Sequence, residues 1–201
     1  MYKRQYDKYG TRNPLSRLVV ARFLSVVDRA VAGTAPASVL DVGCGEGVVT
    51  ARLAALLPAA RVEGLDVDDP ALAAEWGACA GGNLTFRPGS AYALPHPDRS
   101  VDTVCAIEVL EHLERPEAAL AELVRVARRA VVVSTPREPL WRAANMLSGR
   151  YLRDLGNTPG HVNHFSRRAL VRLAGRAGTV RGVWSPFPWT IVRLDVRSPA
   201  G

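Results

Sequence analysis

The segment that decides the fold of this 201-residue chain runs from Val39 to Gly47: Val39-Leu40-Asp41-Val42-Gly43-Cys44-Gly45-Glu46-Gly47. It begins with a short apolar run, typical of a buried strand, and continues into three alternating glycines. A helical pattern follows. Glycine suits such a turn because its backbone adopts positive φ angles and allows a ligand to approach closely. The segment therefore predicts a strand, a ligand-binding turn and a helix.

A second acidic residue supports this interpretation. Asp66 ends the next predicted strand, nineteen residues after Gly47. In a doubly wound fold, an acid at this position binds ribose hydroxyls. The alternative is that the glycines only form a tight turn and that Asp66 is an ordinary exposed acid. The glycine turn and Asp66 occur together at the spacing that a nucleotide-binding fold requires, which argues against this alternative. A dinucleotide fingerprint would need glycine in place of Val48, so a nicotinamide-dependent oxidoreductase is the weaker enzyme alternative.

Helical and strand patterns alternate along the rest of the chain. Helices are predicted at residues 13–32, 50–57, from Asp69-Pro70 onward, 116–126 and 166–178, and strands at 38–42, 61–66, 84–86, 101–106, 130–134, 180–184 and 190–196. This order predicts an α/β fold with a doubly wound, mostly parallel seven-stranded sheet and helices on both faces. The short connection before the final strand makes that strand antiparallel.

The chain shows no linker that would divide it, so we expect one domain over residues 1–201. Within it we expect a helical lid at 1–35, a cofactor-binding half at 36–136, and a substrate-side insert with the closing strands at 137–201. Apolar residues make up 48% and charged residues 22%, as in ordinary globular proteins. Because no apolar stretch could span a bilayer and the first residues lack a signal-peptide core, we expect a cytoplasmic protein.

The spacing of the three cysteines bears on disulfide and zinc sites, and the distribution of the net charge of +7 bears on nucleic-acid binding. The cysteines form no CxxC pair, which argues against a disulfide framework or a zinc site. The positive charge comes mostly from scattered arginines, without a basic run or interleaved aromatic residues. This distribution argues against a nucleic-acid partner.

The glycine segment resembles the D-x-G-x-G-x-G loop of the class I S-adenosylmethionine-dependent methyltransferases. Within that class it is most similar to the methyltransferase type 11 and type 12 families. Three later segments are similar to motifs of the same family: Gly89–Pro95, Ser100–Val104 and Glu108–Leu113, the last reading E-V-L-E-H-L, as at the start of a helix in that family. The resemblance covers residues 6–196, and it specifies the family and the cofactor but not the substrate. It implies methyl transfer from S-adenosyl-L-methionine.

The resemblance also implies a role for each matching residue. Asp41 would orient the loop and contact the methionine amino group, and the loop residues Gly43, Cys44, Gly45 and Gly47 would surround the amino-acid end of the cofactor. Further along the chain, Asp66 would bind the ribose, Val67, Ser90 and Ala91 would contact the adenine, and the carbonyl of Glu108 would line the methionine end. Many relatives carry aspartate where this chain has Ser90, so that adenine contact would be weaker or replaced.

The acceptor side is expected after the fifth strand, where doubly wound folds place their ligands. Arg137, His161 and His164 are the candidate substrate residues, and either histidine could be a general base or could order its loop. A metal is not expected, because the H-x-x-H spacing of the two histidines has no nearby third ligand. We expect a small-molecule acceptor. Methylation of RNA or protein, and a non-catalytic cofactor-binding domain, remain the alternatives.

Overall fold

The computed structural model describes residues 13–147, 157–158 and 160–196. Seven strands form one sheet in the order β3-β2-β1-β4-β5-β7-β6. Their bounds are Ser38–Val42 (β1), Arg61–Asp66 (β2), Leu84–Pro88 (β3), Val101–Ile107 (β4), Ala127–Pro136 (β5), Thr179–Trp184 (β6) and Trp189–Asp195 (β7). The pairs from β3 to β5 are parallel, and β7 is antiparallel to both β5 and β6. The predicted fold class, including the antiparallel last strand, is confirmed.

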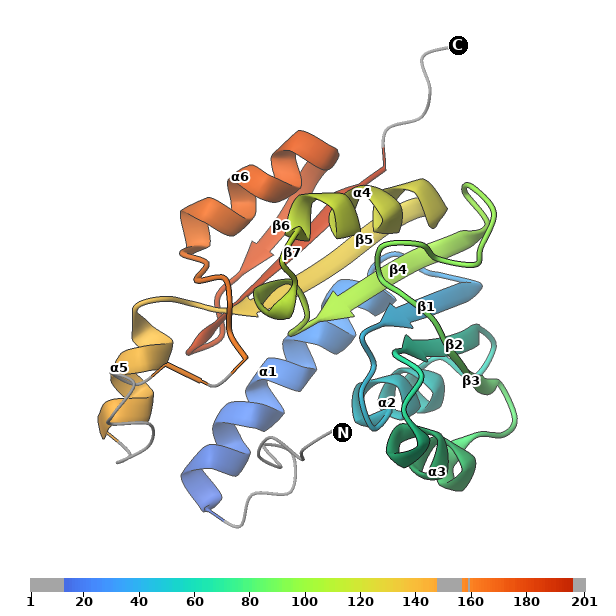
Figure 1. Cartoon of the computed structure of the whole chain (residues 1–201), viewed down its shortest axis with the longest axis horizontal. Helices are drawn as coiled ribbons and strands as arrows, with labels where there is room; N and C mark the ends of the chain where they lie inside the picture. Colours follow the sequence, from blue (N-terminus) through green and yellow to red (C-terminus); the bar gives the residue numbers. More distant parts are fainter. Residues whose placement is uncertain (1–12, 148–156, 159, 197–201) are drawn as a thin grey trace.

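Helices cover both faces of the sheet (Figure 1). They are α1 (Pro14–Ala32), α2 (Val48–Leu56), α3 (Pro70–Cys79), α4 (Pro116–Val126), α5 (Leu140–Leu147) and α6 (Arg167–Ala177). Side chains cap the N-termini of three of them: Asn13 for α1, Asp69 for α3 and Ser166 for α6. None of the described helices combines the length and the apolar character that crossing a bilayer requires.

Two features differ from the sequence predictions. Helix α5 lies in the stretch expected only as an insert. The E-V-L-E-H-L segment begins no α-helix but forms a single 3-10 turn, η1 (Leu110–His112). The backbone on either side explains this, since Glu108 has a φ of 64° and Leu113 is extended. Continuous helix begins only at Pro116, whose fixed φ suits a first turn.

Side chains of the central strands alternate between two apolar cores. Leu40 and Val42 of β1 pack with α4 and α6, whereas Val39 packs with α1 and α2 on the opposite face. Both faces of β1 are therefore buried, and its continuous apolar run is the pattern expected for a parallel central strand.

The strand order places the candidate residues at one edge. Strands β2 and β3 are added on one side of β1, and β4, β5, β7 and β6 are added on its other side. The strand order therefore reverses between β1 and β4. Ligands of open α/β sheets bind at such a reversal, beyond the carboxyl ends of the strands. The glycine loop follows β1, and Glu108 follows β4 at this edge. Residues 1–12 of the expected lid, which include Tyr6, Tyr9 and Arg12, lie outside the described residues.

Candidate functional site

The glycine loop is held against the end of β2 by its backbone. The amides of Gly43 and Cys44 both donate to the carbonyl of Leu65, at 2.7 and 3.2 Å. A Cβ atom at Gly43 would lie 2.4 Å from the side chain of Val109, whereas one at Gly45 would have no heavy atom within 4 Å. Gly43 is thus required by packing within the protein, and Gly45 faces open space that a ligand can occupy.

Asp66 joins this loop to the end of β2. Its Oδ2 accepts a hydrogen bond from the Gly45 amide at 2.6 Å, and its Oδ1 accepts one from the Val67 amide at 2.7 Å. Each carboxylate oxygen can accept a further bond, so the ribose role predicted for Asp66 is compatible with these contacts. Val67, predicted to pack on the adenine, is 59% exposed and offers an apolar surface beside the carboxylate.

Asp41 is a buried acid beneath the loop. Its side chain is 1% exposed, and its Oδ2 accepts a hydrogen bond from the Thr50 hydroxyl at 2.8 Å. Burial raises the pKa of Asp41 to about 7, with a smaller contribution from the charge of Asp66 and an opposing one from Thr50. Burial likewise raises the pKa of the Cys44 thiol. A cationic group bound nearby would favour the ionised form of Asp41, which fits a ligand that carries an ammonium group.

The predicted adenine segment begins directly beside Asp66. The Gly89 amide donates to the Asp66 carbonyl at 2.7 Å, which fixes where the segment starts. Ser90 is exposed, and its hydroxyl accepts a hydrogen bond from the Tyr92 amide at 3.2 Å. Ser90 and Ala91 therefore lie on the loop expected to contact adenine, with the serine hydroxyl used in a local turn.

Glu108 is placed by contacts from two neighbouring strands. Its amide donates to the carbonyl and the hydroxyl of Ser134 in β5, and its Oε2 accepts a hydrogen bond from the Trp189 indole at 2.7 Å. The resemblance assigned a role to the carbonyl of Glu108. The carboxylate contact to β7 is additional, and the sequence alone carries no signal for it.

Other contacts to the loop were also missed from the sequence. Thr50 binds Asp41, and the Trp76 indole donates to the carbonyl of Gly45 at 2.8 Å. Both residues lie on helices that were predicted, α2 and α3. The helical pattern predicts the two helices from the spacing of their apolar residues. It does not reveal that a side chain of such a helix contacts a loop from another part of the chain.

On the acceptor side, the two predicted histidines have different surroundings. The His161 ring lies 4.8 Å from the His112 ring and 6.4 Å from the Trp141 ring, measured between centroids. His164 is exposed, and its Nε2 lies 2.9 Å from Oδ1 of Asn157. Arg137 follows β5, and its amide donates to the Pro188 carbonyl. His161 is thus grouped with residues near the cofactor edge, and His164 with its own loop.

His161 belongs to a cluster that the sequence argument did not predict. One potential ligand atom from each of Glu111, His112 and His161 lies within 4.8 Å of the others. The expectation of no metal rested on the spacing between His161 and His164. The structure instead combines His161 with two residues that lie far before it in the chain. In the sequence, the only indication of this cluster was that Glu111 and His112 are neighbours within the E-V-L-E-H-L segment.

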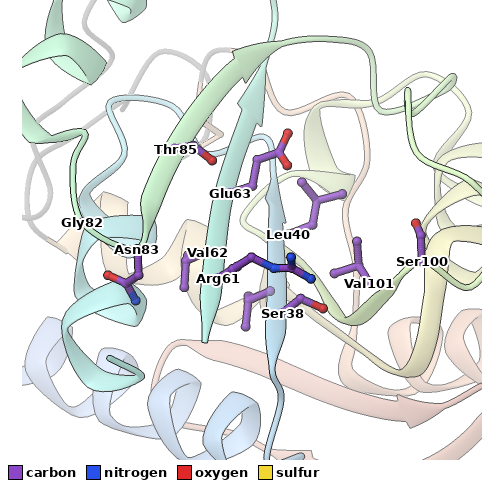
Figure 2. Close-up of a pocket in the computed structure, with 11 residues that line it drawn as sticks. Ser38, Leu40, Arg61, Val62, Glu63, Gly82, Asn83, Thr85, Ser100 and Val101 are labelled. Atoms are coloured by element: carbon purple, nitrogen blue, oxygen red, sulfur yellow. The ribbon is translucent and has the colours of Figure 1, made fainter. Parts of the chain in front are cut away.

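A separate hollow lies away from this edge (Figure 2). Its lining includes Ser38 and Arg61, the first residues of β1 and β2, together with Glu63 and Thr85 on the sheet. The hollow is therefore near the amino ends of the parallel strands. None of the predicted cofactor or substrate residues lines it.

Comparison with known proteins agrees with this geometry. Residues 40–133, just under half of the chain, match a family described as a methyltransferase domain. The demethylmenaquinone methyltransferase of Roseiflexus castenholzii is 33% identical over 150 residues, covering 71% of this chain and 62% of that protein. The ubiquinone biosynthesis O-methyltransferase of Nitrosomonas europaea is 32% identical over 126 residues, covering 61% of this chain and 52% of that protein. The chain thus spans less than two thirds of the length of these relatives.

Solved structures share the fold over most of the chain. The magnesium protoporphyrin IX methyltransferase of Synechocystis, crystallised with S-adenosylhomocysteine, superposes with a TM-score of 0.66 at 22% identity and covers 95% of this chain and 91% of its own. An O-methyltransferase family protein from Burkholderia thailandensis gives a TM-score of 0.71 at 17% identity, covering 92% of this chain and 57% of its own. Together with the matched motifs and the edge geometry above, these similarities support the assignment of this chain to the class I S-adenosylmethionine-dependent methyltransferases.

Proposed function

We propose that this chain transfers the methyl group of S-adenosylmethionine to a small-molecule acceptor. The observation that carries the proposal is the hydrogen bond between Gly45 and Asp66, next to the open space in front of Gly45. It puts a partly exposed loop backbone and a carboxylate with spare acceptor capacity at the reversal of the strand order.

When bound, the cofactor supplies a methyl group already activated by the sulfonium, so the protein's tasks are alignment and exclusion of water. Asp41 would provide a buried carboxylate whose ionised form is favoured by a bound ammonium group. Gly45 and its neighbours would give close backbone contact, and Asp66, which holds the loop, would also bind the ribose. Val67 would cover the adenine with its exposed apolar side chain. Each of these residues acts by binding or orienting rather than by covalent chemistry.

Two observations favour a small-molecule acceptor. The relatives in quinone biosynthesis are named for small molecules. Several arginines that contribute to the net positive charge are paired with carboxylates rather than arranged as a basic surface: Arg52 with Asp28, Arg125 with Glu122 and Asp98, Arg128 with Asp102, and Arg181 with Asp195. Methylation of RNA or protein is the alternative that an acceptor screen would reveal.

The acceptor would bind where Arg137, Glu138 and the loop of His161 and His164 come together. The Glu138 amide donates to the Phe165 carbonyl, which ties the end of β5 to this loop. Burial raises the pKa of Glu138, and the charge of His164 opposes that effect. We place the protein in the cytoplasm, in keeping with its three free cysteines.

The proposal is tested first by ligand binding. S-adenosylhomocysteine at a hundredfold excess over its Kd should stabilise the chain by about 2.7 kcal/mol, which is a rise in Tm on the order of 5–10 °C for a domain of this size. NAD at the same concentration should leave Tm unchanged. Stabilisation by NAD alone would overturn the cofactor assignment. A methyl-transfer screen over phenols, amines, RNA and peptides, read by S-adenosylhomocysteine release, then tests the acceptor class.

A further inference from the structure

The cluster of Glu111, His112 and His161 combines two kinds of metal ligand in one place. A buried carboxylate, an exposed imidazole and a half-buried imidazole bring their ligand atoms within 4.8 Å of one another. Glu111 is 2% exposed, so its carboxylate is held by the surrounding protein rather than by solvent. Two histidines and one carboxylate are the ligand set of many catalytic transition-metal sites, which keep further coordination positions open.

A hydrogen bond to one of the histidines supplies a second observation. Nδ1 of His112 lies 2.9 Å from the carbonyl oxygen of Gly160. A carbonyl can only accept, so Nδ1 carries the proton and Nε2 of the neutral ring keeps its lone pair. Metal-binding histidines characteristically donate their other ring N–H to a carbonyl or carboxylate, which fixes the tautomer and the ring orientation. The hydrogen bond to Gly160 therefore selects the tautomer of His112 that can coordinate a metal through Nε2.

The third ligand is brought into place by backbone bonds between its loop and η1. The amides of Val162 and Asn163 both donate to the carbonyl of Glu111, at 2.9 and 3.0 Å. The side-chain amide of Asn163 donates to the carbonyls of Leu110 and Leu113. These bonds directly follow His161 on the chain, and the contact of His112 with Gly160 directly precedes it, so that its loop is docked on the turn that carries the other two ligands. The arrangement is thus formed before any ion binds.

The cluster lies next to the predicted cofactor site. Val109, whose side chain packs against Gly43 of the glycine loop, immediately precedes η1. Any ion held by Glu111 and His112 is consequently close to the edge at which the cofactor binds, and on the same side as the acceptor loop of His161. This location is what a metal needs in order to contact the acceptor.

We propose that Glu111, His112 and His161 bind a divalent transition-metal ion, and that this ion takes the hydroxyl oxygen of the methyl acceptor. This part of the inference rests on the proposed function. The mixed nitrogen and oxygen ligands favour Zn²⁺, Co²⁺, Fe²⁺ or Mn²⁺ over Mg²⁺, which prefers an all-oxygen shell. A hydroxyl bound to such an ion loses its proton to water at a lower pH than a free hydroxyl. The acceptor class is accordingly an alcohol or a phenol.

Metal binding is tested directly, without activity. Tag-free protein, treated with EDTA and dialysed, is titrated with Co²⁺ and followed by visible absorption, and Zn²⁺ binding is measured by calorimetry. We expect one equivalent of Co²⁺ to bind with ligand-field bands that a tenfold excess of Mg²⁺ does not remove. His161→Ala and Glu111→Gln should each weaken Co²⁺ binding at least tenfold. His164→Ala, on the same loop but outside the cluster, should leave it unchanged.

Binding of S-adenosylhomocysteine is measured on the same samples. A His161→Ala protein that still binds it is folded, so its loss of Co²⁺ binding would support the metal site even if Glu111→Gln fails to fold. The absence of Co²⁺ bands in the parent protein would overturn the inference, as would unchanged Co²⁺ binding in His161→Ala. Failure of the proposed function gives a different pattern, in which Co²⁺ binds but S-adenosylhomocysteine does not.

Discussion

The amide of Gly45 and the Oδ2 atom of Asp66 are 2.6 Å apart, so the carboxylate predicted to bind a ribose also fixes the glycine loop. Asp66→Ala should therefore reduce cofactor affinity and loop order together. A hydrogen bond to a charged group contributes about 1.5–3 kcal/mol, which corresponds to at least a tenfold loss of S-adenosylhomocysteine affinity by calorimetry. Asp66→Asn, which keeps an acceptor without the charge, should bind with intermediate affinity. Equal affinity in all three proteins would show that the ribose is held elsewhere.

Alanine at two positions of the same loop should have separable effects. At Gly43 the new Cβ would collide with Val109, and at Gly45 it would enter open space. Both positions have positive φ, at 75° and 55°, so each variant carries some backbone strain. We expect Gly43→Ala to lower Tm by several degrees more than Gly45→Ala. Gly45→Ala should retain the fold but lose S-adenosylhomocysteine binding. The reverse order of stabilities would contradict the packing described for the loop.

The pKa of Asp41 predicts a pH dependence of stability. Its pKa rises from 3.8 to about 7 on folding, so the native protein holds a proton that the unfolded chain has released over this interval. The stability supplied by the protonated acid is complete below pH 4 and is lost as the pH rises toward 7, with a slope of up to about 1.4 kcal/mol per pH unit. Asp41→Asn should lack this contribution. The difference between the two urea-unfolding curves, measured from pH 4 to 8, isolates it from other carboxylates, and a constant difference would count against it.

The indole of Trp76 should contribute to cofactor affinity through the loop. It donates to the Gly45 carbonyl, and its ring stacks on Phe86 with the ring planes 4° apart. Trp76→Phe removes the donor while keeping an aromatic ring for the stack. A neutral hydrogen bond contributes about 0.5–1.5 kcal/mol, so we expect S-adenosylhomocysteine to bind roughly two- to tenfold more weakly. Trp76→Leu, which also removes the stack, should lower Tm further, and unchanged affinity in Trp76→Phe would exclude this role.

The sequence predicted strand positions well where an apolar run is bounded by chain-breaking residues. The first two strands were placed correctly at residues 38–42 and 61–66. The start of β5 was placed three residues too late, because Arg128 and Arg129 resemble an exposed helix end. In the structure Arg128 pairs with Asp102 of the neighbouring strand at 2.9 Å, and no local pattern signals such a contact.

For the site, the sequence was informative where function depends on one continuous segment. The glycine loop could be recognised because its spacing is itself the structural requirement. The cluster around Glu111 could not, because the loop of His161 docks through backbone bonds to η1. Any residue supplies backbone amides and carbonyls, so these bonds leave no trace in the order of side chains. Similarly, the hydrogen bond between Trp189 and Glu108 depends on β7 lying beside β5.

The packing of α1 on β7 has a consequence for how the domain assembles. Phe23 of the first helix and Trp189 of the last strand stack with ring centroids 4.5 Å apart in the same core. Neither ring can be buried in this way during synthesis until the last strand has left the ribosome. The closing contact therefore has high sequence separation, a property associated with slow folding. Before that point the helix exposes an apolar face, which favours aggregation of the incompletely synthesised chain.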